Sequence, residues 1–593
     1  MIKGFVTWEE GKRFNIPNIL APEKTAGDIT EALNIMGFKH EQIKFLVDYS
    51  RVSAVDMADA ITDLGLGTSE KVTKAESITS GLPYFPAAAA DYVKANLLHS
   101  YAPEIRAEES NIPYVPVGID ENGKVLIAIS NPAKKQETIN SLHKRTRKIE
   151  FCLAAKKIIQ NIYRSEFFDT RSLFTKAREK THSEERFKEM LQALLIHACY
   201  QGASDLHFLP LPNGAGAVFI RIDGVLEPFV ILHRNNRGAE GEELEYDRII
   251  QVIKMDTASQ DGVITEGTLG DSVPPAIAGK YQFRVEITMT VRGASAVIRI
   301  LSVSDDTTEF EEIGFDDITK KRLLHYAGQS AGMLIVTGPT GSGKTTTLNA
   351  LMKTIDPLSE SVQSIENPVE LQVGLWAQHH AKILDNSKSE AQTWIRWFKA
   401  LMRRDPDTIL YGEIRDADTT AVALDGANTG HNVFTTMHTK SASSAVQRLR
   451  NMKLDSTGES LDMDAVSSTL HGILAQRLLR KLCNFCKIPD DRAESHHQIE
   501  KTIELESGQV IYRHNPDGCE ICHGKGYRGR HMIYELLHFT REVRQMVSSK
   551  APITELEAAI DPHLTLWGTG MFLVSRGVTS IDELRRVALE DIE

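Results

Sequence analysis

Residues 338–345 read G-P-T-G-S-G-K-T, a glycine-rich run that ends in lysine and threonine. The apolar, β-prone stretch 333–337 leads directly into it, which is the context of a phosphate-binding loop between a strand and a helix. The glycines let backbone N–H groups turn toward a triphosphate, and the following helix presents its positive end. The run therefore predicts nucleoside triphosphate binding, and a surface loop is the alternative. The predicted nucleotide-binding residues are Gly338, Pro339, Thr340, Gly341, Ser342, Gly343, Lys344, Thr345 and Thr346.

Three further side chains follow β-like runs and suit phosphate chemistry. Glu413 ends an apolar run, and a second strand of a phosphate-loop enzyme supplies a carboxylate beside Mg²⁺, so we expect Thr345 and Glu413 to hold that ion. Glu370 lies in the turn after the run 361–366, where a carboxylate can polarise an attacking water. His438 would lie near the γ-phosphate, although a histidine at such a place is more often structural.

Four of the six cysteines form two C-x-x-C pairs. This spacing is typical of a tetrahedral four-thiolate zinc site. Disulfides are not expected in a reducing compartment, and four thiolates leave no coordination position open for water. We therefore predict structural zinc. The predicted zinc ligands are Cys483, Cys486, Cys519 and Cys522.

Composition narrows the class of protein. A chain of 593 residues predicts about three to five domains. Its net charge of −12 argues against a nucleic-acid partner. No apolar run reaches the about eighteen residues that a membrane helix needs, and the first ten residues lack the apolar core of a signal peptide. We expect a cytoplasmic protein that contacts a membrane only through partners.

The order of strand-like and helix-like stretches predicts an α/β fold. Strands near 333–337, 361–366, 408–413 and 432–438 alternate with helical stretches, which indicates a mostly parallel sheet with helices on both faces. Upstream stretches predict two smaller α/β regions, the second containing a turn at Asp223-Gly224. The expected regions are 1–75, 76–170, 183–302, an acidic linker at 303–315, and 316–593.

Four motifs together resemble the motor ATPases of type II secretion and type IV pilus assembly. They are GPTGSGKTTT at 338–347, IENPVE at 365–370, RRDPDTILYGEIRD at 403–416 and TGHNVFTTMHT at 429–439. The resemblance implies ATP as the nucleotide and a RecA-like P-loop domain over 316–593, with a tetracysteine zinc subdomain at 477–530 and a helical region at 531–593. It implies roles for Lys344 on the phosphates, Glu370 as catalytic carboxylate and His438 as γ-phosphate sensor.

The resemblance also covers the upstream regions. Residues 183–302 are similar to the family's PAS-like domain, and 76–170 to its amino-terminal partner-docking domain, whereas 1–75 is divergent. The family forms homo-hexamers, and the resemblance implies that Arg221 and Arg284 reach the nucleotide of a neighbouring subunit; a surface salt bridge is their alternative role. It implies an inner-membrane platform protein and its cytoplasmic adaptor as partners.

Three other functions stay open. A conjugation-associated secretion ATPase would carry the same motifs. A catalytically weak nucleotide-binding scaffold ring is suggested by Asn367, which stands where the family commonly has aspartate, because an amide cannot act as a general base. A nucleic-acid translocase is disfavoured by the acidic charge.

Overall fold

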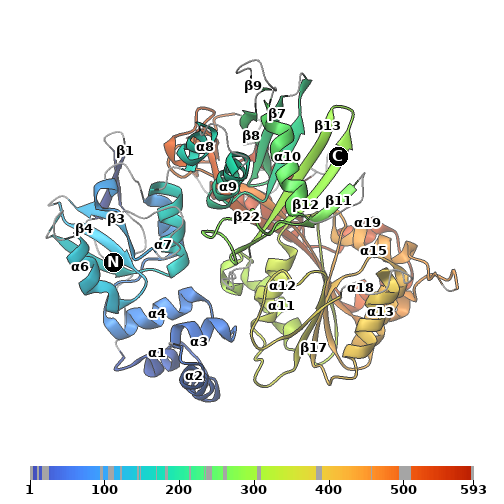
Figure 1. Ribbon diagram of the computed structural model, residues 1–593. Coiled ribbons are helices and arrows are strands. Elements are labelled where there is room, and N and C mark those ends of the chain that lie inside the picture. The colour runs from blue at the N-terminus through green and yellow to red at the C-terminus, as the bar shows by residue number, and fades with distance from the viewer. Residues whose placement is uncertain are drawn as a thin grey trace. The chain divides into compact units, whose positions relative to one another are not determined.

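The computed structural model describes residues 5–9, 12–15, 26–55, 57–93, 98–103, 112–120, 123–142, 146, 148–167, 170–179, 185–212, 215–232, 234–235, 243–257, 264–302, 309–381, 390–455, 457–492 and 509–588. It forms two compact units, Met1–Asp306 and Thr307–Glu593, each with its own sheets (Figure 1). The first part of the expected linker, 303–308, lies outside the described residues. Among the described helices, none has the length and apolar character needed to cross a membrane.

The first four helices of the chain are short and lie in the first unit. Asp28 caps the first of them, accepting a hydrogen bond from the N–H of Glu31 at 2.9 Å, and Thr68 caps the fourth. Leu33, Leu46 and Ile61 are fully buried among these helices. The four helices are α1 (Ile29–Ile35), α2 (His40–Ser53), α3 (Met57–Asp63) and α4 (Ser69–Ser80).

The first unit also holds a five-stranded sheet with the order β2-β1-β3-β4-β5, whose first two strands precede the four helices in the chain. All five residues of its fourth strand are buried, as the continuous apolar run 125–129 predicts. That strand pairs in parallel with the fifth, and the other pairs are antiparallel. Its elements and the helices that follow are β1 (Phe5–Glu9), β2 (Lys12–Asn15), β3 (Tyr114–Asp120), β4 (Val125–Ile129), α6 (Lys135–Leu142), β5 (Ile149–Leu153), α7 (Lys156–Ile162) and α8 (Thr170–Glu179).

The expected 183–302 region holds a six-stranded antiparallel sheet with the order β11-β12-β13-β6-β7-β8. The predicted turn at Asp223-Gly224 joins β7 to β8, and both residues have positive φ, as a tight hairpin turn requires. The elements are α9 (Glu185–Tyr200), β6 (Asp205–Pro210), β7 (Gly216–Ile222), β8 (Val225–Leu232), β9 (Arg234–Asn235), β10 (Glu243–Leu244), α10 (Glu245–Asp256), β11 (Ile264–Thr268), β12 (Tyr281–Thr290) and β13 (Gly293–Ser302).

The second unit is built on a seven-stranded sheet with the order β16-β15-β17-β18-β14-β19-β22. Every neighbouring pair is parallel except β19 and β22, which confirms the mostly parallel sheet. The strands and intervening helices are α11 (Asp317–Ala327), β14 (Gly332–Thr337), α12 (Lys344–Met352), β15 (Val362–Glu366), β16 (Ala377–His380), α13 (Glu390–Leu401), β17 (Thr408–Glu413), α14 (Ala417–Asn428), β18 (Asn432–Met437), α15 (Ala442–Asn451), α16 (Met463–Thr469) and β19 (Leu470–Leu482).

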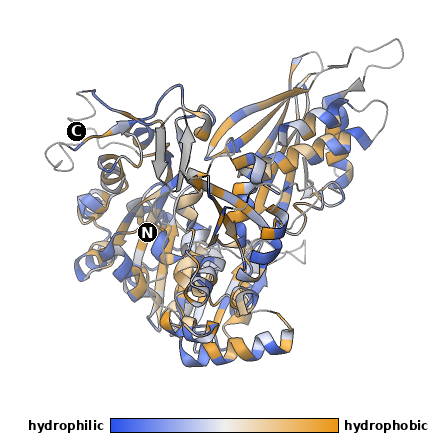
Figure 2. Ribbon diagram, turned by 90° about the vertical axis from the view of Figure 1, so that its left-hand side faces the viewer, coloured by the Kyte–Doolittle hydropathy of each residue, from blue (hydrophilic) through white to orange (hydrophobic). Residues whose placement is uncertain are grey.

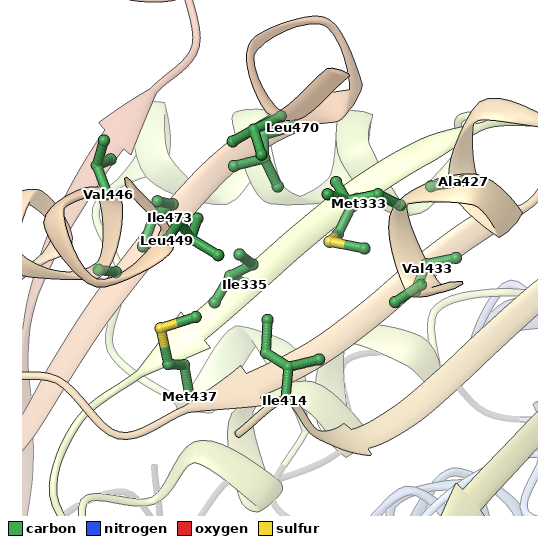
Figure 3. Packing of buried hydrophobic residues seen from close by; sticks show 14 of the residues in the cluster. Met333, Ile335, Ile414, Ala427, Val433, Met437, Val446, Leu449, Leu470 and Ile473 are labelled. Carbon is green, nitrogen blue, oxygen red and sulfur yellow. The ribbon is translucent and has the colours of Figure 1, made fainter. Parts of the chain in front are cut away.

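Residues along these strands alternate between two cores. Met333 and Ile335 of β14 pack in one cluster with α13, α14 and α15, whereas Leu334 and Val336 pack in another with α11 and α12. Figure 3 shows the first cluster, where Ile335 lies near Ile473 of β19. Individual helices carry both hydrophobic and hydrophilic residues along their length (Figure 2). Helices therefore cover both faces of the sheet, as predicted.

The end of the expected linker packs into this unit, because the aromatic rings of Phe310 and Phe315 are buried and Phe315 lies edge-on to Tyr534, with centroids 4.9 Å apart. At one edge of the sheet, β19 and β22 form a long antiparallel ribbon, and the two cysteine pairs lie in the chain that connects these strands. The remaining elements are β20 (Ile488–Pro489), β21 (Tyr512–Arg513), β22 (Tyr527–His538), α18 (Arg541–Ser548), α19 (Ile553–Ala558), α20 (Leu566–Ser575) and α21 (Ile581–Val587).

Candidate functional site

The predicted phosphate loop joins β14 to α12. Gly338 has a φ of +154°, and a Cβ atom there would lie 2.5 Å from the carbonyl oxygen of Gln476, so the close approach requires glycine. Gly343 has a φ of +87° and caps α12. Gln476, on β19, donates its side-chain N–H to the carbonyl oxygen of Ser342 at 2.8 Å. The neighbouring strand therefore holds the loop from one side.

Lys344, the first residue of α12, is buried, and only 9% of its surface is exposed. Its Nζ donates to the carbonyl oxygens of Gly338 at 3.0 Å and Pro339 at 3.1 Å. Burial lowers the pKa of this ammonium, and the nearby carboxylates of Glu413 and Glu370 act against that shift. Lys344, which the sequence assigns to phosphate binding, is thus acted on by the negative charges of both predicted acids, Glu413 and Glu370.

Glu413 is the last residue of β17, beside the end of β18. One carboxylate oxygen lies 3.1 Å from Nη2 of Arg415, and the other lies 3.5 Å from Nε2 of His438. Burial and the positive charge of Lys344 lower the pKa of His438, with Glu413 opposing them, and so favour the neutral imidazole. The ends of β17 and β18 bring Glu413 and His438 together, and the charge of Lys344, at the start of α12, acts on His438.

The turn that carries Glu370 follows β15. Glu370 is exposed, and its charge acts on both Lys344 and the buried Glu366. Burial raises the pKa of Glu366, although hydrogen bonds from Ser364 and Gln378 oppose the rise. Asn367 is exposed and its Oδ1 lies 3.2 Å from Nε2 of His380. Glu370 is therefore the solvent-facing carboxylate of this turn.

The residues proposed for Mg²⁺ have the right donor chemistry. Thr345 and Thr346 follow Lys344 in the first turn of α12, both at least partly exposed. The Glu413 side chain is 22% exposed at its strand end. Hydroxyl and carboxylate oxygens are the hard ligands that Mg²⁺ prefers, with phosphate oxygens completing the set. Thr345 and Glu413 fit this ion.

The four predicted zinc ligands converge between β19 and β22. Their Sγ atoms lie within 4.8 Å of one another. The Sγ atoms of Cys483 and Cys519 are 3.7 Å apart, those of Cys486 and Cys522 are 3.8 Å apart, and those of Cys519 and Cys522 are 3.8 Å apart. Sulfurs arranged tetrahedrally at about 2.3 Å from a zinc ion would be separated by about 3.8 Å. The cluster therefore fits zinc.

Backbone groups around the cluster favour a thiolate at one position. Burial raises the pKa of Cys483 to about 11 and also raises that of Cys486. Burial would raise the pKa of Cys522 too, but N–H groups of Cys519 and Gly526 donate to its Sγ at 3.2 and 3.1 Å and lower it. The remaining two cysteines, Cys152 and Cys199, are buried apart from this cluster.

The two arginines predicted to act in trans lie on the six-stranded sheet of the first unit. Arg221 of β7 has its Nε 3.6 Å from Oδ2 of Asp205 and donates to the carbonyl oxygen of Gly224 at 3.2 Å. Arg284 of β12 stands opposite Arg299 of β13. The P-loop belongs to the other unit, so the role of Arg221 and Arg284 in a neighbouring subunit stays a prediction.

Sequence reasoning missed residues that hold the site in place. Thr337 and Thr439 hydrogen-bond through their hydroxyls at 2.7 Å and join the ends of β14 and β18. Arg448 of α15 donates to the carbonyl oxygens of Arg415 and His438, each at 3.1 Å. These contacts are made by hydroxyl groups and backbone carbonyl oxygens, and no spacing in the sequence signals them.

A glycine-rich loop between a buried strand and a helix, a buried lysine, and a carboxylate on a neighbouring parallel strand define a P-loop nucleotide-binding protein. The chain matches the family described as "Type II/IV secretion system protein" over residues 180–586. It therefore belongs to that family.

Curated relatives carry names from two kinds of machine. The type IV pilus assembly ATPase TfpB of Acinetobacter baylyi is 32% identical over 68% of this chain and 66% of its own length. The type IV pilus assembly ATPase PilB of Thermus thermophilus is 30% identical over 74% of this chain, which spans only 48% of that relative. The type II secretion system protein E of Aeromonas hydrophila is 32% identical over 68% of this chain and 75% of its own length.

Proposed function

We propose that the protein is a Mg²⁺-dependent ATPase, working as a homo-hexameric ring, that powers assembly of a type IV pilus or a type II secretion pseudopilus. The observation that carries the proposal is that Glu413 and His438 meet at the ends of neighbouring strands, where the charge of Lys344 acts on His438. The carboxylates of Glu413 and Glu370 both act on Lys344 in turn. The names of the curated relatives support the pilus and secretion context.

Each residue has a defined task in hydrolysis. Lys344 would exchange the carbonyl oxygens of Gly338 and Pro339 for phosphate oxygens, which carry more negative charge. Thr345 and Glu413 would hold Mg²⁺, and this ion would neutralise negative charge on the phosphates. Glu370 would orient the attacking water from its exposed position. His438, neutral and beside Glu413, would donate or accept a hydrogen bond at the γ-phosphate.

In the proposed ring, Arg221 and Arg284 would reach the nucleotide of the adjacent subunit and stabilise charge that develops during phosphoryl transfer. Turnover would then couple to movement between subunits. The region 76–170 would dock onto a cytoplasmic adaptor of an inner-membrane platform protein, which would keep the motor at the cytoplasmic side of that membrane. The tetracysteine cluster would hold zinc in a structural role.

Phosphate release by the purified full-length oligomer with Mg·ATP tests the enzymatic part. The motor reading expects turnover in wild type and its loss in Lys344→Ala and Glu370→Gln, with the control Lys353→Ala, at the far end of α12, remaining active. Tight ATP binding without turnover in wild type would instead indicate the scaffold ring. Stimulation by DNA with steep salt dependence would indicate a translocase.

The cellular part is tested separately. Deletion of the gene should abolish surface filaments or protein export, and complementation with wild type, but not with Lys344→Ala, should restore them. Normal filaments and export in the deletion strain would overturn the assembly role even if the ATPase activity were present. Dependence of plasmid transfer on the gene would indicate the conjugation system.

A further inference from the structure

Arg448 spans the ends of two strands that carry site residues. It lies on α15, which begins just after His438. Its Nη1 donates to the carbonyl oxygen of His438 at 3.1 Å, and its Nη2 donates to the carbonyl oxygen of Arg415 at 3.1 Å. One guanidinium therefore ties the chain after β18 to the chain after β17.

The two tied residues converge on one carboxylate. Arg415 contacts Oε2 of Glu413 at 3.1 Å, and His438 lies 3.5 Å from Oε1 of the same carboxylate. Each residue whose backbone Arg448 holds thus contacts a different oxygen of Glu413. Arg448 itself makes none of the contacts to Glu413 or to the phosphate loop that define the site.

The helix that carries Arg448 is itself firmly held. On this helix, Ala445, Val446 and Leu449 are buried in the hydrophobic core of the unit. Its first N–H group, that of Ala442, donates to the buried carboxylate of Glu535 at 2.8 Å. A planar guanidinium can donate to two carbonyl oxygens in a fixed geometry, whereas an ammonium is a point donor on a flexible stem. Arg448 is therefore a rigid brace.

We propose that Arg448 is a positioning residue for ATP hydrolysis, which fixes Glu413 and His438 relative to each other by bracing the backbone of Arg415 and His438. The inference rests on the proposed function. Small displacements of a catalytic constellation are expensive, since a shift of about 1 Å can lower a rate by about 100-fold. Loss of the brace should affect turnover and Mg²⁺ use more than nucleotide binding.

The chain supplies a matched control on the same helix. Arg450 also donates to two carbonyl oxygens, those of Ala551 at 2.6 Å and Met546 at 3.2 Å. Those acceptors lie in α18 and in the segment that follows it, not at the strand ends. Replacing Arg450 removes an equivalent pair of structural bonds without touching the backbone of Arg415 or His438.

The experiment compares Arg448→Gln, Arg448→Lys, Arg450→Gln and wild type as full-length oligomers. Steady-state phosphate release gives kcat, KM for ATP and the Mg²⁺ concentration at half-maximal rate, and thermal unfolding gives Tm. Arg448→Gln should lower kcat by about 10- to 100-fold and raise the Mg²⁺ requirement, with KM changed less than about threefold. Arg448→Lys should have a kcat between those of Arg448→Gln and wild type, because lysine keeps the positive charge but offers a single donor nitrogen.

Arg450→Gln should lower Tm while keeping kcat near that of wild type. The proposal is overturned if Arg448→Gln keeps wild-type kcat and Mg²⁺ dependence, or if Arg450→Gln lowers kcat as much as Arg448→Gln does. If Arg448→Gln does not fold, Arg448→Lys decides by the same measurements, and wild-type kcat and Mg²⁺ dependence in that variant count against the brace. Absence of turnover in wild type would instead refute the proposed function.

Discussion

The tetracysteine cluster and the nucleotide site lie on the same unit but are built in different ways. The metal ligands come from two short knuckles, and their sulfurs already have the separations that one ion demands. The nucleotide site draws on the carboxyl ends of several strands, and Lys344 bonds to its own loop. In the tetracysteine cluster, one bound ion would hold the four side chains together. In the nucleotide site, the parallel sheet holds the side chains in place.

The difference teaches where each site is vulnerable. Burial disfavours the thiolate forms of Cys483 and Cys486, and a bound cation would offset that cost by balancing the negative charge. The nucleotide site, in contrast, is held by the packing of the parallel strands and by braces such as Arg448. Loss of a zinc ligand should therefore unfold the segment around the cysteines, whereas loss of a side chain from the nucleotide site should leave that site folded but inactive.

The largest expected effect is on stability at the metal cluster. Cys519→Ser, or removal of the ion with a strong chelator, should abolish metal content and destabilise the segment around the knuckles, since a structural zinc site contributes on the order of 10 kcal/mol. Elemental analysis and thermal unfolding measure both. Cys152→Ala, at a buried cysteine far from the cluster in sequence, should keep the metal. Metal-free wild type with unchanged Tm would contradict the assignment.

The second expected effect is on catalysis alone. Glu413→Gln keeps the size of the side chain but loses the charge that would hold Mg²⁺ and face Lys344. Turnover should fall by about 100- to 1000-fold, with Tm and zinc content close to wild type. Phosphate release and thermal unfolding of one preparation give both numbers. A Tm loss as large as that of Cys519→Ser would show that the two sites are not built differently.

A third effect tests the support between the two sites. The fully buried carboxylate of Glu583 pairs with Arg480 of β19 at 2.7 Å and with Arg586 at 2.6 Å. Burial opposes ionisation, but these hydrogen bonds outweigh it and lower the pKa of Glu583 below its ordinary value of 4.5. Glu583→Gln should cost about 3 kcal/mol at pH 7 because it leaves the arginines without their buried partner.

The pH dependence of that effect follows from the sign of the shift. A carboxylate whose folded-state pKa is lowered contributes stability that is present above pH 4.5 and is lost as the pH falls through the folded-state pKa. The Tm difference between wild type and Glu583→Gln should therefore shrink in acid. Glu555→Gln, at an exposed acid of α19, should show little difference at any pH. A Glu583→Gln penalty independent of pH would contradict this account.

The smallest expected effect concerns Asn367. Its side chain is exposed and contacts His380, so an added charge there would be screened by water. Asn367→Asp should change kcat by less than about threefold. Steady-state phosphate release measures it, with Glu370→Gln as the inactive reference. A rise of more than about tenfold would show that this position limits catalysis and would favour a weak wild-type enzyme.

Much of this architecture was predictable from the sequence because its signals are local. The run 333–337 and the glycines after it predict a strand and a loop, and the cysteine spacing predicts a metal cluster that the sulfur distances support. Glu413 and His438 were predictable because both end apolar runs, and parallel strands end at one edge of a sheet.

Other features were not predictable because they depend on contacts distant in sequence. Phe5 and Val6 of β1 pair with β3, more than a hundred residues later, and no pattern within residues 1–75 specifies that partner. The bonds of Arg448 go to backbone carbonyl oxygens, which every residue has, so the sequence does not distinguish this arginine from Arg450. The proposed role of Arg221 and Arg284 at a nucleotide involves a second copy of the chain, which no pattern within one chain can place.

The ribbon of β19 and β22 has one further consequence. Gln476 touches the phosphate loop and Cys483, seven residues along the same chain, opens the metal cluster, a span of about 23 Å for an extended strand. Paired strands resist stretching, so the ribbon should keep the distance between the phosphate loop and the metal cluster constant. Spin labels beside each end should report the same separation with and without bound nucleotide.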